Sequence, residues 1–450
     1  MKRRKGIALL LVGLMTVGLL AGCGTKKEDS GSSNGNKGSV YYLNFKPEVS
    51  KEWEEIAKEY TKETGVDVKV STAASGQYES TLKSEIAKKN PPTLFQINGP
   101  IGYQSWKEYT MDLSDTELYK NLTNQDLAIK DGDGIYGVPY VVEGYGIIYN
   151  DEIMQKYFAL SDKVLDITST DEITDYDTFQ KVVEDMTKHK SDLGIDGVFS
   201  STSFAAGEDW RWQTHLANIP VYYEYKDAGK SDMDKIDFTY NKNFKSMFDL
   251  YLNNSITEPG LVGSKTVEDS MAEFALGKTA MVQNGNWGWG QVSGTDGNTV
   301  KEKNIKFMPI YTGMPEDKEQ GICIGTENFF CINDKANEAD KKATLDFVNW
   351  LITSDKGKDY MTNTLGFISP FSTFGEDEQP EDPLAQEVVR FMNDDERTNL
   401  TWVFSTFPSQ TFKDDFGASL LEYAQGNKEW KSVVSDMTDS WAAEKEMIAQ

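Results

Sequence analysis

Hydrophobic and polar positions predict strands and helices in alternation from residue 40 onward. Residues 40–45 form a short apolar run, 50–65 show helical spacing, and 66–70 alternate as a strand does. A second helical pattern at 77–89 precedes an apolar run at 93–98. The apolar face of the first helix consists of Trp53, Ile56, Ala57 and Tyr60. This order predicts an α/β fold whose parallel sheet carries helices on its faces.

In such sheets, ligands bind beyond the carboxyl ends of the strands. The predicted ends are residues 44–48, 71–76 and 98–103. Asn44 is a candidate ligand-binding residue on this basis. Lys46 and Glu48 lie at the same end, although exposed charges need no function.

Three later segments show amphipathic helical spacing: 176–188, 341–353 and a stretch beginning near residue 430. The first aligns Phe179, Val182, Val183 and Met186 on one face. Stripes of this kind are typical of core packing.

The first residues have the pattern of a secretory signal, with four cationic residues at 2–5 before an uncharged run at 7–21. The run ends in the letters LAGC, which resemble the lipobox of bacterial lipoproteins. This predicts a signal peptide at 1–22, lipidation at Cys23 and a flexible tether at 23–39. A membrane-spanning helix is the alternative, but the run is shorter than the ~20 apolar residues that a span needs.

The formal net charge of -26 argues against nucleic acid as a partner, because phosphate binding needs clustered cations. It also leaves the lipid as the expected attachment to the membrane. Only two histidines are present, which disfavours a zinc site or His-based catalysis. Cys323 and Cys331 have apolar neighbours, so we expect buried free thiols more than a disulfide.

Cofactor motifs fail in their context. The glycines at 132–137 have dinucleotide-motif spacing but precede Val138-Pro139 where a helix should begin. The letters GKT at 277–279 lack the first glycine of a phosphate-binding loop, because Ala272 stands there. We therefore expect neither a cofactor nor a metal.

Three blocks occur in the order found in one bacterial family. They are GIYGVPYVVEGYGIIYN at 134–150, FALGKTAMVQNGNW at 274–287, and KATLDFVNWL at 342–351 with GFISP at 366–370. Together they resemble the extracellular solute-binding proteins of family 1, the maltose-binding-protein-like sugar receptors of ABC importers. The resemblance covers essentially all of residues 40–450.

The resemblance implies two α/β lobes of a periplasmic-binding-protein-like fold, assembled from discontinuous segments and joined by a hinge. The first lobe would take 40–142 and 311–357, and the second 143–310 and 358–450. Ligand would bind in the cleft between them.

A sugar site needs aromatic platforms together with amides and carboxylates. Trp287 is the main candidate, because the neighbouring glycines expose its face and because it matches a family block. The other candidate platforms are Trp210, Trp212 and Trp402, for which core packing is the alternative. Asp209 and Arg211 flank Trp210 in a polar cluster, which is equally consistent with an acidic helix N-terminus.

The resemblance also places Glu143 at the crossover between lobes, where relatives direct a carboxylate into the cleft. A solvated hinge acid is the alternative. Asn98 matches a strand end at which relatives place a polar sugar contact, although this chain has no acid there. We include Glu327 among the candidate ligand-binding residues.

The sequence therefore predicts a lipid-anchored monomer at the extracellular face of the cell membrane. It would bind an oligosaccharide and deliver it to the permease subunits of an ABC transporter, without catalysis. Two alternatives stay open: a secreted glycoside hydrolase, because the many carboxylates could supply an acid–base pair, and the same fold with a non-sugar cargo.

Overall fold

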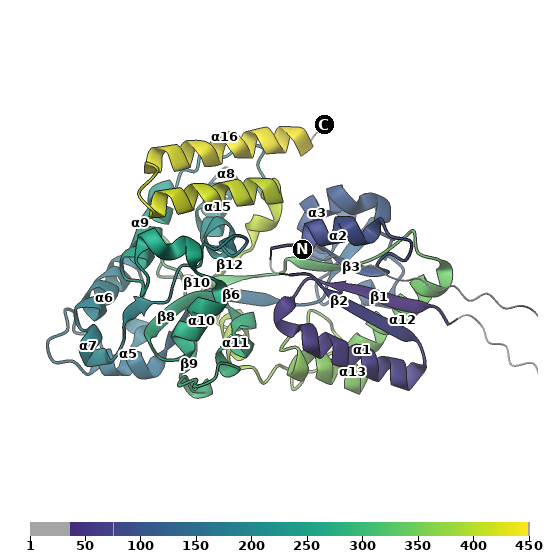
Figure 1. Cartoon of the computed structure of the whole chain (residues 1–450), viewed down its shortest axis with the longest axis horizontal. Helices are drawn as coiled ribbons and strands as arrows, with labels where there is room; N and C mark the ends of the chain where they lie inside the picture. The colour runs from purple at the N-terminus through teal and green to yellow at the C-terminus, as the bar shows by residue number, and fades with distance from the viewer. Residues whose placement is uncertain (1–36, 75, 449–450) are drawn as a thin grey trace, which may run out of the picture. The chain divides into compact units, whose positions relative to one another are not determined.

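The computed structural model describes residues 37–74 and 76–448. Cys23, the predicted signal peptide and most of the predicted tether lie outside the described residues. The described chain is organised around two six-stranded sheets (Figure 1). No helix within these residues is long and apolar enough to cross a membrane.

The first sheet has the order β2-β1-β3-β11-β5-β4. Its strands are β1 (Ser39–Asn44), β2 (Asp67–Thr72), β3 (Leu94–Asn98), β4 (Ile129–Asp131), β5 (Gly134–Pro139) and β11 (Asn328–Ile332). Strands β2, β1 and β3 are parallel, which confirms the prediction for this part of the sheet. Strand β11 is antiparallel to both of its neighbours, β3 and β5.

The second sheet has the order β12-β10-β6-β8-β7, with β9 paired to β6. Its strands are β6 (Glu143–Asn150), β7 (Gly197–Phe199), β8 (Thr279–Gly285), β9 (Ile305–Met308), β10 (Gln320–Gly325) and β12 (Thr398–Thr401). Strand β6 is buried along its whole length, because it pairs with β8, β9 and β10.

Helices cover both faces of each sheet (Figure 1). Around the first sheet these are α1 (Ser50–Thr64), α2 (Tyr78–Ile86), α3 (Gly99–Trp106), α4 (Glu117–Lys120), α12 (Glu338–Thr353) and α13 (Asp355–Asp359). Around the second they are α5 (Asp151–Phe158), α6 (Tyr176–Lys188), α7 (Lys190–Leu193), α8 (Ala217–Ala228), α9 (Asn241–Asn253), α10 (Val267–Ala275), α11 (Trp289–Ser293), α14 (Pro383–Met392), α15 (Gln410–Ala424) and α16 (Trp430–Ile448).

Alternation along the strands divides the core of the first sheet into two layers. Tyr42 packs with Trp53 of α1 and Phe347 of α12 on one face. Leu43, the next residue, packs with Leu82 of α2 on the other face. A strand buried on both faces therefore shows a continuous apolar run, as residues 40–45 do.

The chain crosses between the sheets more than once. The first crossing lies between β5 and β6, as the family block at 134–150 implied. The next crossing lies between β10, which belongs to the second sheet, and β11, which belongs to the first. The sequence had assigned all of residues 311–357, β10 included, to the first lobe. Phe367 and Phe371 pack in the core of the first sheet, beyond the expected limit at 357. We therefore propose revised lobe limits, with the return crossings near residues 326 and 372.

The amphipathic patterns predicted the long helices well. Helix α1 buries Trp53, Ile56, Ala57 and Tyr60 and ends at Gly65, whose φ of 72° suits a residue without a Cβ. Helix α6 has the predicted bounds. Cys323 and Cys331 are free and buried, which confirms that interpretation.

The packing of α1 makes a first prediction. Trp53 is fully buried against Tyr42, so Trp53→Ala should lower the free energy of unfolding by about 3 to 5 kcal/mol in urea denaturation. Lys58→Ala, on the exposed face of the same helix, is the control and should change it by less than about 0.5 kcal/mol. Equal effects of the two substitutions would contradict the assignment of the buried face.

Candidate functional site

A cavity of about 430 Å³ lies between the two sheets and has walls from both lobes. Such a volume is within the range of small-molecule sites. From the first sheet and its connections come Phe45, Lys46, Glu48, Tyr78, Glu79, Asn98, Glu327 and Asn328. From the second come Glu143, Glu208, Asp209, Trp210, Gln213, Thr214, His215, Trp287, Gln291, Trp402, Phe404, Lys413 and Asp414.

The carboxyl ends of β1 and β3 open into this cavity. Phe45 and Lys46 follow β1, and Asn98 is the last residue of β3. Because the two strands are parallel neighbours, their ends meet at one edge of the sheet. The strand ends that the sequence pointed to therefore line the cavity together, and ligand binding there stays a prediction.

Lys46 and Glu143 form a buried ion pair across the cleft. The Lys46 Nζ lies 2.6 Å from Glu143 Oε1 and 3.6 Å from Glu48 Oε1. Burial opposes the charge on Lys46, but Glu143 and Glu48 outweigh it and raise the lysine pKa. The pair joins the end of β1 to the first residue of β6, so it connects the two lobes at a crossing.

Aromatic rings form one wall of the cavity. The ring centroid of Trp287 lies 6.1 Å from that of Trp210, 6.4 Å from that of Trp402 and 5.6 Å from that of His215. Trp287 is only partly buried, so a face of its indole remains available to the cavity. Burial lowers the pKa of His215 well below its ordinary value, which keeps this ring neutral.

Gly325 allows Trp402 to lie against the second sheet. A Cβ at this position would come within 2.5 Å of the Trp402 Cγ. Any larger residue would therefore displace the indole from the cavity wall.

Carboxylates and one further lysine complete the polar lining. Burial raises the pKa of Asp209 to about 6, and the nearby charges of Asp414 and Glu208 act in the same direction. Burial also raises the pKa of Glu327 and lowers that of Lys413. Within the described residues, no group of three or more His, Cys, Asp or Glu side chains is arranged to hold a metal ion.

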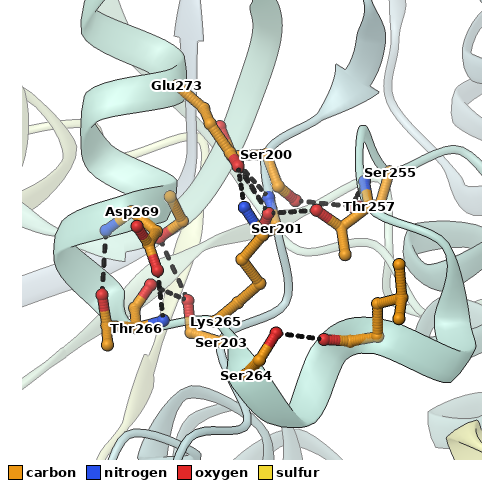
Figure 2. A network of polar contacts seen from close by, with 12 residues as sticks. Ser200, Ser201, Ser203, Ser255, Thr257, Ser264, Lys265, Thr266, Asp269 and Glu273 are labelled. Atoms are coloured by element: carbon orange, nitrogen blue, oxygen red, sulfur yellow. Dashed lines mark hydrogen bonds and ion pairs between the residues drawn. The ribbon is translucent and has the colours of Figure 1, made fainter.

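A polar network fixes the loop that leads to Asp209 and Trp210 (Figure 2). The Ser201 hydroxyl and backbone N–H donate to the Glu273 carboxylate of α10, which also pairs with Lys265 at 3.1 Å. The Ser203 hydroxyl donates to the Thr266 carbonyl at 2.7 Å. The loop is thereby tied to α10, and the cavity wall that follows is held in place.

Three predicted ligand-binding residues do not line the cavity. Arg211 is fully buried and donates to the Gln283 carbonyl at 2.9 Å and to the Ser270 hydroxyl at 2.8 Å, so it holds the fold together. Trp212 is fully buried and donates to a backbone carbonyl. The Asn44 amide donates to the Lys46 carbonyl at 2.7 Å and so shapes the end of β1 from within.

The other seven predicted residues do line it: Trp287, Glu143, Asn98, Trp210, Asp209, Trp402 and Glu327. Sequence reasoning missed His215, Asn328 and Lys413. Lys413 shares a face of α15 with Gln410 and Asp414, which also line the cavity. That i, i+3, i+4 spacing of polar residues was the available signal.

Two discontinuous lobes with a ligand-sized cavity between them define a binding protein of the two-lobed type. The chain belongs to the family of bacterial extracellular solute-binding proteins, whose model matches residues 55–387. This confirms the resemblance drawn from the three sequence blocks. No curated protein matches the chain.

Solved structures share the fold at low identity. A chitin oligosaccharide binding protein is 18% identical with a TM-score of 0.71, covering 92% of this chain and 100% of that one. The apo form of RafE from Streptococcus pneumoniae is 18% identical with a TM-score of 0.62, covering 90% and 98%. The GacH receptor of Streptomyces glaucescens is 14% identical with a TM-score of 0.66, covering 91% and 98%.

The environment of Asp209 makes a prediction about pH. Its folded pKa of about 6 lies above the ordinary value of 3.8, so the folded state binds the extra proton and loses stability as pH rises from about 4 to 6. Asp209→Asn should remove this loss and gain on the order of 2 to 3 kcal/mol relative to wild type at neutral pH.

Urea denaturation across this pH range measures the effect. Asp415→Asn, an exposed acid on α15, is the control and should leave the pH dependence unchanged. A wild-type pH dependence retained in Asp209→Asn would contradict the assigned pKa.

Proposed function

We propose that this protein captures an oligosaccharide in the interlobe cavity and delivers it to the permease subunits of an ABC importer. The observation that carries the proposal is that Trp287, Trp210 and Trp402 line one cavity together with carboxylates and amides. Indole faces match the apolar faces of pyranose rings, and carboxylates and amides match the hydroxyl rim. Three structures of the same fold are a chitin oligosaccharide binding protein, RafE in complex with raffinose and GacH in complex with acarbose, which supports this class of ligand.

Ligand exchange requires the lobes to separate. A Cβ at Gly76, on the first lobe, would lie 3.0 Å from the backbone of Gly207 on the second. A Cβ at Gly99 would lie 2.9 Å from Ser405. The two lobes therefore approach each other closely at these two places, and hinge motion at the crossings supplies the opening.

Binding without turnover is the proposed activity. The family and the structures of this fold are binding proteins, and the cavity carboxylate Glu143 is already engaged by Lys46. A secreted glycoside hydrolase is the alternative. Release of shorter sugars, detected by thin-layer chromatography, would favour it over a receptor.

Trp287 provides the direct test of the sugar site. Stacking of its partly buried indole contributes about 2 kcal/mol at about 25 cal/mol per Å², so Trp287→Ala should weaken binding at least about tenfold in calorimetry. The melting temperature of the ligand-free variant should stay near that of wild type, because the ring lies at the edge of the core and is only partly buried.

Trp289→Ala is the matched control. Trp289 lies two residues further along the chain, does not line the cavity, and packs beside α10. Both indoles are partly buried, so Trp289→Ala should change the melting temperature about as much as Trp287→Ala does and leave the affinity of the folded protein unchanged. A reversed pattern, with Trp287→Ala unstable and fully able to bind, would refute the role of Trp287 as a sugar platform.

We also propose attachment to the outer face of the membrane through a lipid on Cys23, with the protein acting as a monomer. The cationic start, the apolar run and the LAGC motif support this. Cys23→Ala should move the protein from the membrane fraction to the medium or the wash after cell fractionation. Retention of the variant in the membrane fraction would rule out lipidation as the anchor.

A further inference from the structure

Two asparagines stand side by side on the cavity wall of the first lobe. Asn98 ends β3 and Asn328 begins β11, and the two residues are direct partners in the antiparallel register. Partners in a sheet place their side chains on the same face, about 4.5 to 5.5 Å apart at Cβ. Both residues line the cavity.

The Oδ1 atoms of both side chains are buried without a hydrogen-bond partner in the described part of the protein. Asn328 is only 1% exposed, so its side chain lies within the cavity wall in this conformation. Buried polar atoms are nearly always paired, and an unpaired one is unfavourable. A stable wall that carries two of them next to each other points to a partner that arrives with the ligand.

The position of Asn98 strengthens this interpretation. Asn98 is the N-cap of α3, where an asparagine oxygen ordinarily accepts a hydrogen bond from the first turn of the helix. Here the side chain makes no such bond. The oxygen is therefore kept from its usual local partner.

We propose that Asn98 and Asn328 together form a diol site, which binds two neighbouring hydroxyl groups on one edge of a sugar ring. Each hydroxyl donates to one amide oxygen, and rotation about the soft terminal torsion of each asparagine turns the oxygen to the cavity. The proposal deepens the proposed function, on which it rests. It assigns Asn328, the first residue of β11, as a residue that determines specificity.

The test compares Asn328→Leu and Asn98→Leu with wild type. Raffinose, chitotriose, maltotriose and xylotriose are titrated by calorimetry, and the tightest binder is then used throughout. Each variant should bind this probe about three- to tenfold more weakly, the value of one neutral hydrogen bond. The ligand-free Asn328→Leu variant should melt at the wild-type temperature or above it, because leucine leaves no unpaired oxygen.

Asn349→Leu is the matched control. Asn349, on α12, also has a buried unpaired Oδ1, but it does not line the cavity. Its substitution should leave the affinity for the probe unchanged. A form of the probe that lacks the hydroxyl bound by Asn328 should bind wild type more weakly than the probe itself does. Its affinity for Asn328→Leu should be no lower than its affinity for wild type.

The outcomes separate the two proposals. If wild type binds none of the four sugars, both the oligosaccharide function and the diol site are overturned. If wild type binds one of them and the asparagine variants bind it equally well, the diol site alone is overturned. A fall in both affinity and melting temperature for Asn328→Leu would also overturn it, since the residue would then be structural.

Discussion

The buried ion pair between Lys46 and Glu143 is the interaction on which the arrangement of the two lobes depends. A lone buried ion costs several kcal/mol, and for Lys46 that cost is offset by Glu143 at 2.6 Å and by Glu48 at 3.6 Å. Lys46 is held by the turn after β1, which Asn44 shapes, and Glu143 is held by the central strand β6. The pair therefore fixes the relation between the two strand ends that line the cavity.

The rest of the cavity follows from that relation. The first lobe contributes strand ends with carboxylates and amides, and the second contributes indoles supported by a tightly bonded interior. Arg211 does not line the cavity, and its hydrogen bonds to Gln283 and Ser270 connect β8 to α10. A rigid hydrogen-bonded layer behind the contact residues keeps the platforms in position.

Much of the fold and part of the site could be predicted from the sequence. Helices α1 and α6 follow from simple 3.6-residue periodicity, and Glu143 and Trp287 from family blocks. The sequence could not show which side chains of the segment Asp209–Trp212 face the cavity. All four residue types suit a sugar site, and only the rotational phase of the following helix decides which of them point inward. That helix, η5 (Arg211–Leu216), is a π-helix, so ordinary periodicity gives the wrong face. Asn328 was missed because only the sheet order places it beside Asn98.

The position of β11 has a consequence for the order of folding. This strand lies between β3 and β5 in the first sheet, although almost the whole second sheet precedes it in the chain. During synthesis from the N-terminus, β3 and β5 have no partner strand between them until residues 328–332 emerge. The N-terminal lobe therefore cannot complete its core early. Most of the chain must be present before either lobe can finish folding. A chain with such interleaved topology completes its domains later in synthesis than one whose domains follow each other in sequence.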